Sequence, residues 1–291
     1  MLTQHRILLA TDGSPSAQAA LATAAKFPWP RSSRAQAVVA RFRWLPAVSE
    51  EARAAAEASF EGIADTARGV LARRWPEAKI VFIDEPSGDA ILGEATRFKA
   101  SLIVLGWRGH GTFRRLLAGS VSRRVAAHAQ CPVLVVREPA KAVRRFVVGF
   151  DGCPNSKRAL EFLSSLEPGR GNRVVLVTVV QPVQTPASIA RFPRSMRASI
   201  DQQVAAQNEE QRQQAEAAVV AAATRLERSG WTAKGEVRIG APLASLEAVA
   251  EHRADVLMLG ARATGGLEHM LLGSVANGAL DQSPVPVMLM R

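Results

Sequence analysis

Short apolar segments alternate with longer amphipathic segments along the whole chain of 291 residues. In the first half, this pattern predicts strands at Arg6–Thr11, Ala37–Arg43, Lys79–Asp84, Leu102–Leu105 and Val133–Val136. It predicts one helix that begins near Ser14 and three more over about Ser49–Arg74, Asp89–Phe98 and Ser120–Ala129. Nearly unbroken apolar strands between amphipathic helices are typical of a parallel sheet that helices cover on both faces.

The second half shows the same alternation. Strands are predicted at Phe146–Phe150, Val174–Val180, Thr232–Arg238, Val256–Leu259 and Val287–Met290, and a long helix over about Arg197–Ser229. Because crossovers between parallel strands are right-handed, the pattern indicates a doubly wound α/β fold in each half. In such folds, ligands bind beyond the carboxyl ends of the strands.

The two halves are copies of one unit. Residues 101–137 align with residues 255–291 without a gap, at a constant offset of 154 residues. Residues 7–21 match residues 146–160, each with an Asp-Gly pair after an apolar run and a proline soon after it. Landmarks shared in the same order at both ends indicate a duplication. We therefore predict two domains, 1–139 and 140–291, with the junction near Pro139–Arg144.

The first half places a glycine pattern at the expected ligand edge. Asp12 follows the first strand, and Gly106, Gly109, Gly119 and Ser120 form the spacing G-x2-G-x9-G-S after the fourth. Glycines let main-chain N–H groups point at an anion, and a helix N-terminus attracts phosphate. An acidic residue such as Asp12 suits a ribose hydroxyl. A single glycine is better explained as a turn or a cap, but the complete spacing predicts a phosphate site.

The Asp-Gly-Ser turn, the glycine spacing and the closing segment CPVLVVR resemble the universal stress protein family in its tandem form. The resemblance covers essentially the whole chain. It implies two five-stranded parallel-sheet domains (Rossmann-like, adenine nucleotide α-hydrolase-like) with strand order 3-2-1-4-5. It also implies an intrachain pseudo-dimer, in which Val133–Val136 and Val287–Met290 pair antiparallel. Their apolarity alone is equally explained by burial within each sheet.

In the ATP-binding branch of that family, the early Asp lies near the ribose, the end of strand two meets the adenine through main chain, and the glycine motif holds the phosphates. The residues at these positions are Ala10, Thr11, Asp12, Arg41 or Phe42, Gly106, Arg108, Gly109, His110, Gly119, Ser120 and Val121. Arg108 and His110 are expected to face the phosphates. His110 is interpreted as a phosphate donor or loop residue, because no partner for a catalytic base is evident. Mg²⁺ could accompany ATP, although the sequence shows no dedicated ligand set.

The second half departs from the pattern at one position. Asp151, Gly260, Gly273 and Ser274 are kept, but Ala263 stands where the middle glycine belongs. A Cβ atom disfavours positive φ by about 1–2 kcal/mol. We expect a second site that binds more weakly or not at all, and a purely scaffolding second half remains an alternative.

Composition limits the classes of binding partner and indicates the cellular compartment. The formal net charge of +11 is spread over both halves without a basic tail, and the chain has no tyrosine. Nucleic-acid binding is therefore not favoured, because single strands need aromatic stacking platforms. Cys131 and Cys153 form no CxxC pair, which suits a reducing cytosol. No signal peptide or membrane span is predicted, so a cytoplasmic location is expected.

The leading hypothesis is an ATP-binding stress-response sensor or regulator with little or no hydrolysis. No Walker motif is present, and no carboxylate cluster for metal-assisted phosphoryl transfer is evident. Two alternatives remain open: a slow ATPase or adenylating enzyme of a related α/β superfamily, and a protein-interaction module without nucleotide. The regulatory partner is unknown, and a homodimer of the tandem chain is a further expectation.

Overall fold

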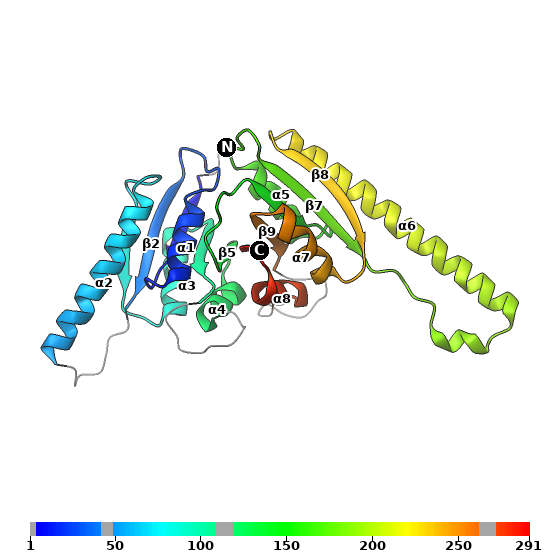
Figure 1. The fold of residues 1–291 in the computed structure, drawn as a ribbon, viewed down its shortest axis with the longest axis horizontal. Coiled ribbons are helices and arrows are strands. Elements are labelled where there is room, and N and C mark those ends of the chain that lie inside the picture. Colours follow the sequence, from blue (N-terminus) through cyan, green and yellow to red (C-terminus); the bar gives the residue numbers. More distant parts are fainter. Residues whose placement is uncertain (1–3, 42–48, 109–118, 262–271) are drawn as a thin grey trace.

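The computed structural model describes residues 4–41, 49–108, 119–261 and 272–291. In the first half, strands and helices alternate (Figure 1). The strands are β1 (Arg6–Ala10), β2 (Arg34–Ala40), β3 (Lys79–Ile83), β4 (Leu102–Gly106) and β5 (Val133–Val136). The helices are α1 (Pro15–Ala24), α2 (Glu50–Leu71), α3 (Ser87–Phe98) and α4 (Ser120–His128).

The second half repeats this order with one additional 3-10 helix. Its strands are β6 (Arg145–Gly149), β7 (Arg173–Val180), β8 (Thr232–Ile239), β9 (Val256–Gly260) and β10 (Val287–Met290). Its helices are α5 (Pro154–Ser164), η1 (Ala187–Arg191), α6 (Arg194–Glu227), α7 (Pro242–Arg253) and α8 (Ser274–Gln282).

The prediction for the second strand was wrong at its start. We expected Ala37–Arg43, but β2 begins three residues earlier and ends at Ala40. Arg34 and Gln36 interrupt the apolar pattern, yet both belong to the ladder, because Arg34 pairs with Arg6 of β1 and Gln36 with Lys79 of β3. Main-chain pairing, rather than apolar character, therefore sets this boundary.

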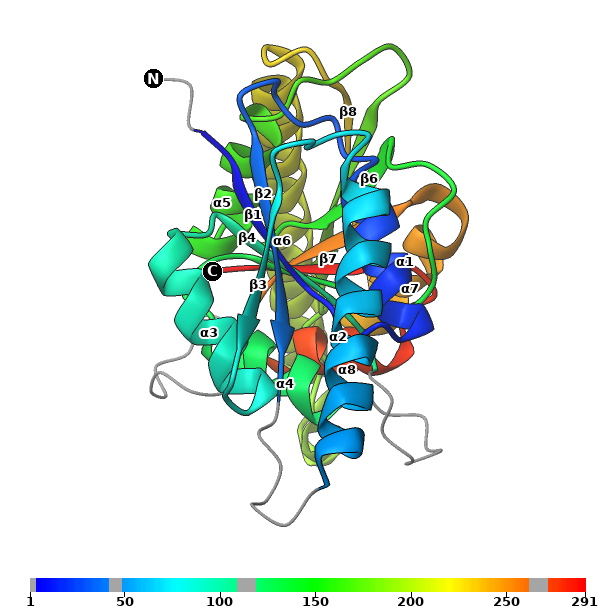
Figure 2. The same cartoon turned by 90° about the vertical axis from the view of Figure 1, so that its left-hand side faces the viewer.

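All described strands form one sheet of ten strands, in the order β3-β2-β1-β4-β5-β10-β9-β6-β7-β8. Each half has the order 3-2-1-4-5 and is parallel throughout, which confirms the predicted fold class. Helices α1, α2, α5 and α6 cover one face and α3, α4, α7 and α8 the other, as the turned view shows for the first half (Figure 2). Each of the two cores contains side chains of both halves, so the halves are joined on both faces of the sheet.

The halves meet at the antiparallel pair β5–β10, and the implied pseudo-dimer is confirmed. Leu134 pairs with Met288, which is its own counterpart in the duplicated sequence. The flanking pairs are Val133 with Leu289 and Val135 with Val287. The approximate two-fold axis therefore passes between Leu134 and Met288, and the pairing covers two sheet edges that would otherwise be open.

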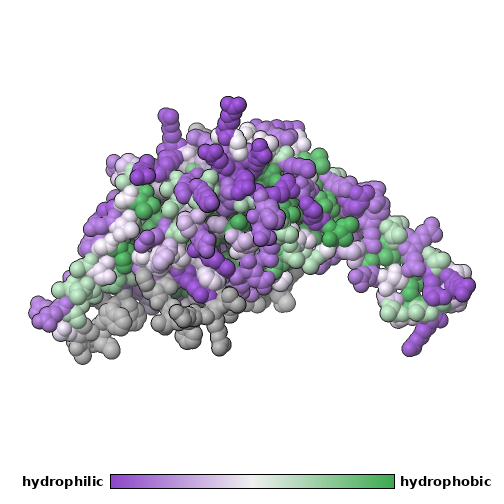
Figure 3. Space-filling view, viewed as in Figure 1, coloured by the Kyte–Doolittle hydropathy of each residue, from purple (hydrophilic) through white to green (hydrophobic). Residues whose placement is uncertain are grey.

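Helix α6 extends well beyond the sheet as an arm (Figure 1). Its buried side chains all belong to its last third, from Val219 to Leu226. Hydrophobic side chains are exposed near the outer end of the arm, among them Phe192 and Met196 (Figure 3). With so few buried contacts, the outer arm is expected to be the least stable helical segment described here.

His5 joins the two halves at the opposite edge of the sheet from the carboxyl ends. Its Nε2 lies 3.0 Å from Ser165 Oγ and 3.2 Å from the Ser165 carbonyl oxygen. Its ring packs against those of Trp29 and Phe162, at centroid distances of 5.2 and 5.6 Å. Burial lowers the pKa of His5, and the hydrogen bond to the Ser165 carbonyl only partly offsets that effect.

We expect His5 to make stability depend on pH. The unfolded chain protonates this histidine near its ordinary pKa of about 6.5, whereas the folded chain resists protonation. The stability that the buried, neutral His5 contributes is therefore fully present above about pH 6.5 and is lost as the pH falls below that value. Urea unfolding at several pH values between neutral and mildly acidic measures the effect. His5→Phe should show a shallower decline, and an unchanged decline would contradict the assignment.

Candidate functional site

The chain turns sharply between β1 and α1, where the strands of the first half end. Thr11 Oγ1 accepts a hydrogen bond from the Gly13 N–H at 3.2 Å, and Asp12 Oδ1 accepts one from the Ser14 N–H at 3.0 Å. Gly13 has φ of +78°, a conformation that favours glycine. Ser14 then caps α1 by accepting from the Ala17 N–H. The turn holds the exposed Asp12 at the edge where ligands are expected.

Gly106 ends β4 against the first turn of α1. A Cβ atom there would lie 2.5 Å from Ser16 Oγ and 2.7 Å from the main-chain nitrogen of Ala17. The hydroxyl groups of Ser14 and Ser16 both donate to the Arg108 carbonyl oxygen. The close approach of helix and strand therefore requires a glycine, and it ties the start of the following loop to α1.

The two ends of that loop are joined to each other. The Gly119 N–H donates to the Trp107 carbonyl oxygen at 2.9 Å, and Ser122 Oγ donates to the same oxygen at 2.9 Å. Gly119 is the N-cap of α4, and no side chain among the described residues caps this helix. Ser120 and Val121 belong to its first turn. Of the predicted site residues, Gly109 and His110 lie outside the described residues.

The side chains of the two arginines among the predicted site residues contact other groups. Arg41 Nε donates to Asp84 Oδ1 at 2.9 Å, and its guanidinium lies 4.9 Å from the Phe82 ring centroid. The predicted neighbour of Arg41, Phe42, is outside the described residues. The Arg108 guanidinium lies 4.0 Å from the centroid of the Trp107 ring. The structure thus links Asp12, Gly106, Gly119 and Ser120 through α1 and the loop ends, while Arg41 stands further out, toward β3.

The second half repeats the main-chain frame. Asp151 Oδ1 accepts from the Cys153 N–H at 3.0 Å, and Gly152 has φ of +76°. Burial opposes the charge of Asp151, but hydrogen bonds from Cys153 and Ser156 outweigh it and lower its pKa. Gly260 ends β9, Gly273 caps α8, and Ser274 begins that helix.

The loop ends of the second half are joined in the same way, because the Gly273 N–H donates to the Ala261 carbonyl oxygen at 2.9 Å. Ala263, the predicted departure from the motif, lies outside the described residues. The turns and helix caps described for the two halves share their main-chain hydrogen bonds and differ in their side chains.

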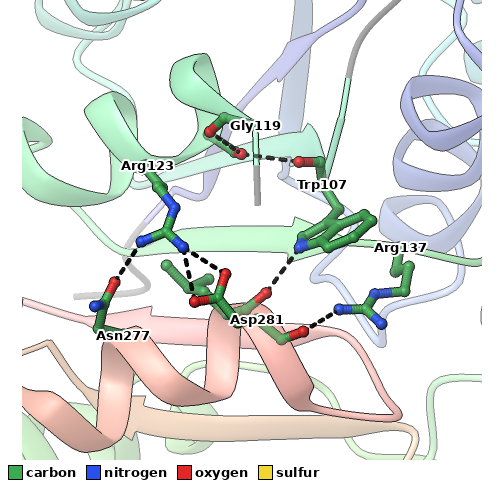
Figure 4. Close-up of polar contacts among 8 residues, drawn as sticks. Trp107, Gly119, Arg123, Arg137, Asn277 and Asp281 are labelled. Carbon is green, nitrogen blue, oxygen red and sulfur yellow. Dashed lines mark hydrogen bonds and ion pairs between the residues drawn. The ribbon is translucent and has the colours of Figure 1, made fainter. Parts of the chain in front are cut away.

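Sequence reasoning missed Trp107, which joins the loop to the other half (Figure 4). Its Nε1–H donates to the Leu280 carbonyl oxygen of α8 at 2.8 Å. Guanidinium groups lie over its ring at 4.0 Å (Arg108) and 3.9 Å (Arg137), distances typical of cation–π contacts. The counterpart of Trp107 is Ala261, so the contact has no equivalent in the second half. That difference within a gap-free alignment is the signal that could have identified it.

An ion pair beside Trp107 strengthens this junction (Figure 4). Arg123 of α4 donates to both carboxylate oxygens of Asp281 at 2.6 and 2.7 Å, and to Asn277 Oδ1 at 2.9 Å. Arg137 donates to the Asp281 carbonyl oxygen at 2.6 Å. Arg123 and Asn277 are counterparts in the duplication, so this contact also lies near the two-fold axis. The glycine loop is therefore attached to α8 of the other half.

Metal-ligand clusters and membrane-spanning helices are both absent from the described residues. Among residues 4–41, 49–108, 119–261 and 272–291, no three His, Cys, Asp or Glu side chains gather where a metal ion could be held. Within the same residues, no helix has the length and apolar character needed to span a membrane. The groups that the candidate site offers are main-chain N–H groups, hydroxyls and a helix N-terminus, which are donors for an anion.

A duplicated 3-2-1-4-5 sheet, joined through its last strands, defines a tandem doubly wound α/β protein. The model of the Universal stress protein family matches residues 4–137 and again residues 142–291. The chain belongs to the universal stress protein family.

Known members resemble this chain over different lengths. A universal stress protein of Mycobacterium tuberculosis is 28% identical over 204 residues, which are 66% of this chain and 62% of that protein. The chain thus spans about 62% of the length of that relative. A shorter one from Thermus aquaticus is 36% identical over 140 residues, covering 45% of this chain and 97% of that protein. The crystal structure of a universal stress protein from Archaeoglobus fulgidus covers 100% of this chain and 97% of its own, with a TM-score of 0.68 and 19% identity, which supports the shared fold.

Proposed function

We propose that the first half binds ATP at the carboxyl edge of β1, β2 and β4, and that the protein acts in the cytoplasm as a sensor or regulator with little or no hydrolysis. Asp12, with Ala10 and Thr11 beside it, would lie near the ribose, and main chain at the end of β2, at Arg41 or Phe42, would meet the adenine. Membership of the universal stress protein family supports the assignment. The phosphates would lie against Gly106, Gly109, Gly119, Ser120 and Val121.

The observation that carries this proposal is the N-terminus of α4. Gly119 gives the helix no side-chain cap, so its first-turn N–H groups have no acceptor from that residue. These groups and the helix dipole together favour an anion. The bond from Gly119 to the Trp107 carbonyl oxygen brings both ends of the glycine loop to this point.

The same geometry supports a regulatory role. The residue that accepts from Gly119, Trp107, also donates to Leu280 of the other half. A phosphate bound at the N-terminus of α4 would therefore act on a contact between the halves, and a partner could read that change. Any Mg²⁺ would be held mainly by the phosphates, because the described residues contain no cluster of metal ligands.

The first experiment denatures the purified protein and identifies any nucleotide that is released. The second measures thermal unfolding with added ATP and follows phosphate release. At a ligand concentration of about 100 times Kd, binding should stabilise the folded state by about 2.7 kcal/mol. Released ATP or ADP, or this stabilisation, would support the proposal. Finding neither would overturn it, and sustained turnover would replace the sensor with an ATPase.

A matched pair of variants tests the site itself. Aspartate is a favourable N-cap, so Gly119→Asp should keep α4 folded while placing a negative charge where the phosphates are proposed. The apparent affinity for ATP, measured by its thermal stabilisation of the protein, should then fall at least about tenfold, because like charges repel in the site. Gly273→Asp makes the same change at the N-cap of α8 and should leave most of the ATP binding intact. Normal binding by Gly119→Asp would contradict the assignment.

A further inference from the structure

A hollow lies where the strands of the first half begin, at the opposite ends of the strands from the proposed ATP site. It has a volume of about 730 Å³, within the range of small-molecule pockets. Five cations and one carboxylate, Glu77, line it; the cations are Arg6, Arg31, Arg34, Arg74 and Lys79. Hydrophilic side chains cover this upper edge of the molecule (Figure 3).

The sheet itself brings three of these cations together. Arg6, Arg34 and Lys79 are the first residues of β1, β2 and β3, which are neighbouring parallel strands. Arg6 pairs in register with Arg34, and Lys79 pairs with Gln36, two residues further along β2. Three like charges at one edge repel one another, so their alignment is unfavourable unless an anion is present.

Arg74 is fixed at the side of the hollow. Its guanidinium donates to the carbonyl oxygens of Trp29 at 2.8 Å and Pro30 at 3.0 Å. These bonds hold the charge in place without neutralising it, because both acceptors are uncharged. Within the part of the chain that the structure describes, no carboxylate forms an ion pair with any of the five cations.

Comparison with the second half shows what Arg6 lacks. Its counterpart, Arg145, donates to Asp255 Oδ1 through Nε at 3.1 Å and through a terminal nitrogen at 2.8 Å. In the first half the position of Asp255 is taken by Ser101, which accepts only from the main-chain N–H of Arg6, at 2.9 Å. The Arg6 guanidinium lies over the Phe98 ring at 4.7 Å, and its Nε is buried without a hydrogen-bond partner among the described residues.

We propose that this basic hollow binds a small polyanion, a molecule that carries two or more phosphate or carboxylate groups. Arginine forks match such groups with paired hydrogen bonds, and the Arg6 guanidinium has no carboxylate partner among the described residues. The duplicated unit has a carboxylate at this position in the second half, Asp255, and has Ser101 in the first half, where the hollow lies. The first domain would then have an anion site at each edge of its sheet, and this one does not depend on the ATP proposal.

Calorimetry with sodium tripolyphosphate tests the hollow. All proteins carry Gly119→Asp, which weakens the proposed ATP site, and salt is kept at about 50 mM, because higher salt weakens electrostatic binding. Arg34→Gln/Lys79→Gln should weaken binding by at least about tenfold, through lost charge-assisted hydrogen bonds. Ser101→Asp should have a similar effect, because it restores the carboxylate that Arg145 has. Urea unfolding checks that each variant is folded.

Arg173→Gln is the matched control, since Arg173 begins β7 and pairs in register with Arg145 as Arg34 does with Arg6. It should change the affinity by less than about twofold, because it removes a charge outside the hollow. Three results would overturn the proposal: no binding of tripolyphosphate, equal weakening by Arg173→Gln, or tighter binding of a duplex oligonucleotide that is lost in the same variants. The last would assign the surface to nucleic acid.

Discussion

Replacing Asp281 with alanine is expected to destabilise the protein by about 3 kcal/mol, near the lower end of the cost of breaking a buried ion pair. The Asp281 side chain is 14% exposed and that of Arg123 is 32% exposed, so solvent screens the pair only in part. The variant leaves the Arg123 guanidinium at the junction without its two carboxylate bonds, with Arg137 close to the same helix end. Urea unfolding measures the change as a shift of the midpoint.

The double variant Arg123→Leu/Asp281→Leu separates the cost of the unpaired charge from the value of the pair. Replacing both partners with apolar side chains removes the desolvation cost together with the attraction, so it should be milder than Asp281→Ala alone. Asn277 Oδ1 keeps access to solvent in that variant. If the free energy of unfolding of Asp281→Ala is within about 0.5 kcal/mol of that of the unchanged protein, the junction does not depend on this pair.

The fold could be predicted because the duplication repeats every strong local signal. Ile7 and Leu9 face one core while Leu8 and Ala10 face the other, which is the reason that β1 reads as an unbroken apolar run. The antiparallel junction followed from a resemblance, because the apolar residues of β5 and β10 fit burial within one sheet equally well. The Leu134–Met288 pair distinguishes the two, since it places a residue beside its own counterpart.

Of the candidate site, the sequence predicts the parts that depend on local main-chain geometry. Asp12, Gly106 and Gly119 were identified by spacing, and the turns and caps that they form depend on local geometry. The link from Trp107 to Leu280 spans 173 residues of sequence and depends on how the halves meet. The difference between Ser101 and Asp255 was visible in the alignment of the two halves, but its meaning required the placement of Arg6.

Gly106→Ala is expected to destabilise the protein by about 3 kcal/mol, the upper part of the usual cost of overpacking. The added Cβ would lie 2.7 Å from the main-chain nitrogen of Ala17 and 2.7 Å from the carbonyl carbon of Ser16. Main-chain atoms in the first turn of a packed helix cannot rotate away as a long side chain can. Helix α1 must therefore move from β4, and this strains the bonds from Ser14 and Ser16 to the Arg108 carbonyl.

Gly93→Ala is the control for Gly106→Ala, because it adds the same methyl group within α3 of the same half. The nearest atom to a Cβ there is a terminal nitrogen of Arg97 at 4.0 Å, so there is no overlap. Glycine within a helix is less favourable than alanine by about 0.5–1 kcal/mol, so this variant should be more stable than the unchanged protein. Opposite signs for the two variants in urea unfolding would show that close approach, and not helix or strand preference, requires glycine at the end of β4. Equal small effects would mean that α1 can move from β4 at little cost, and the steric account of Gly106 would then be wrong.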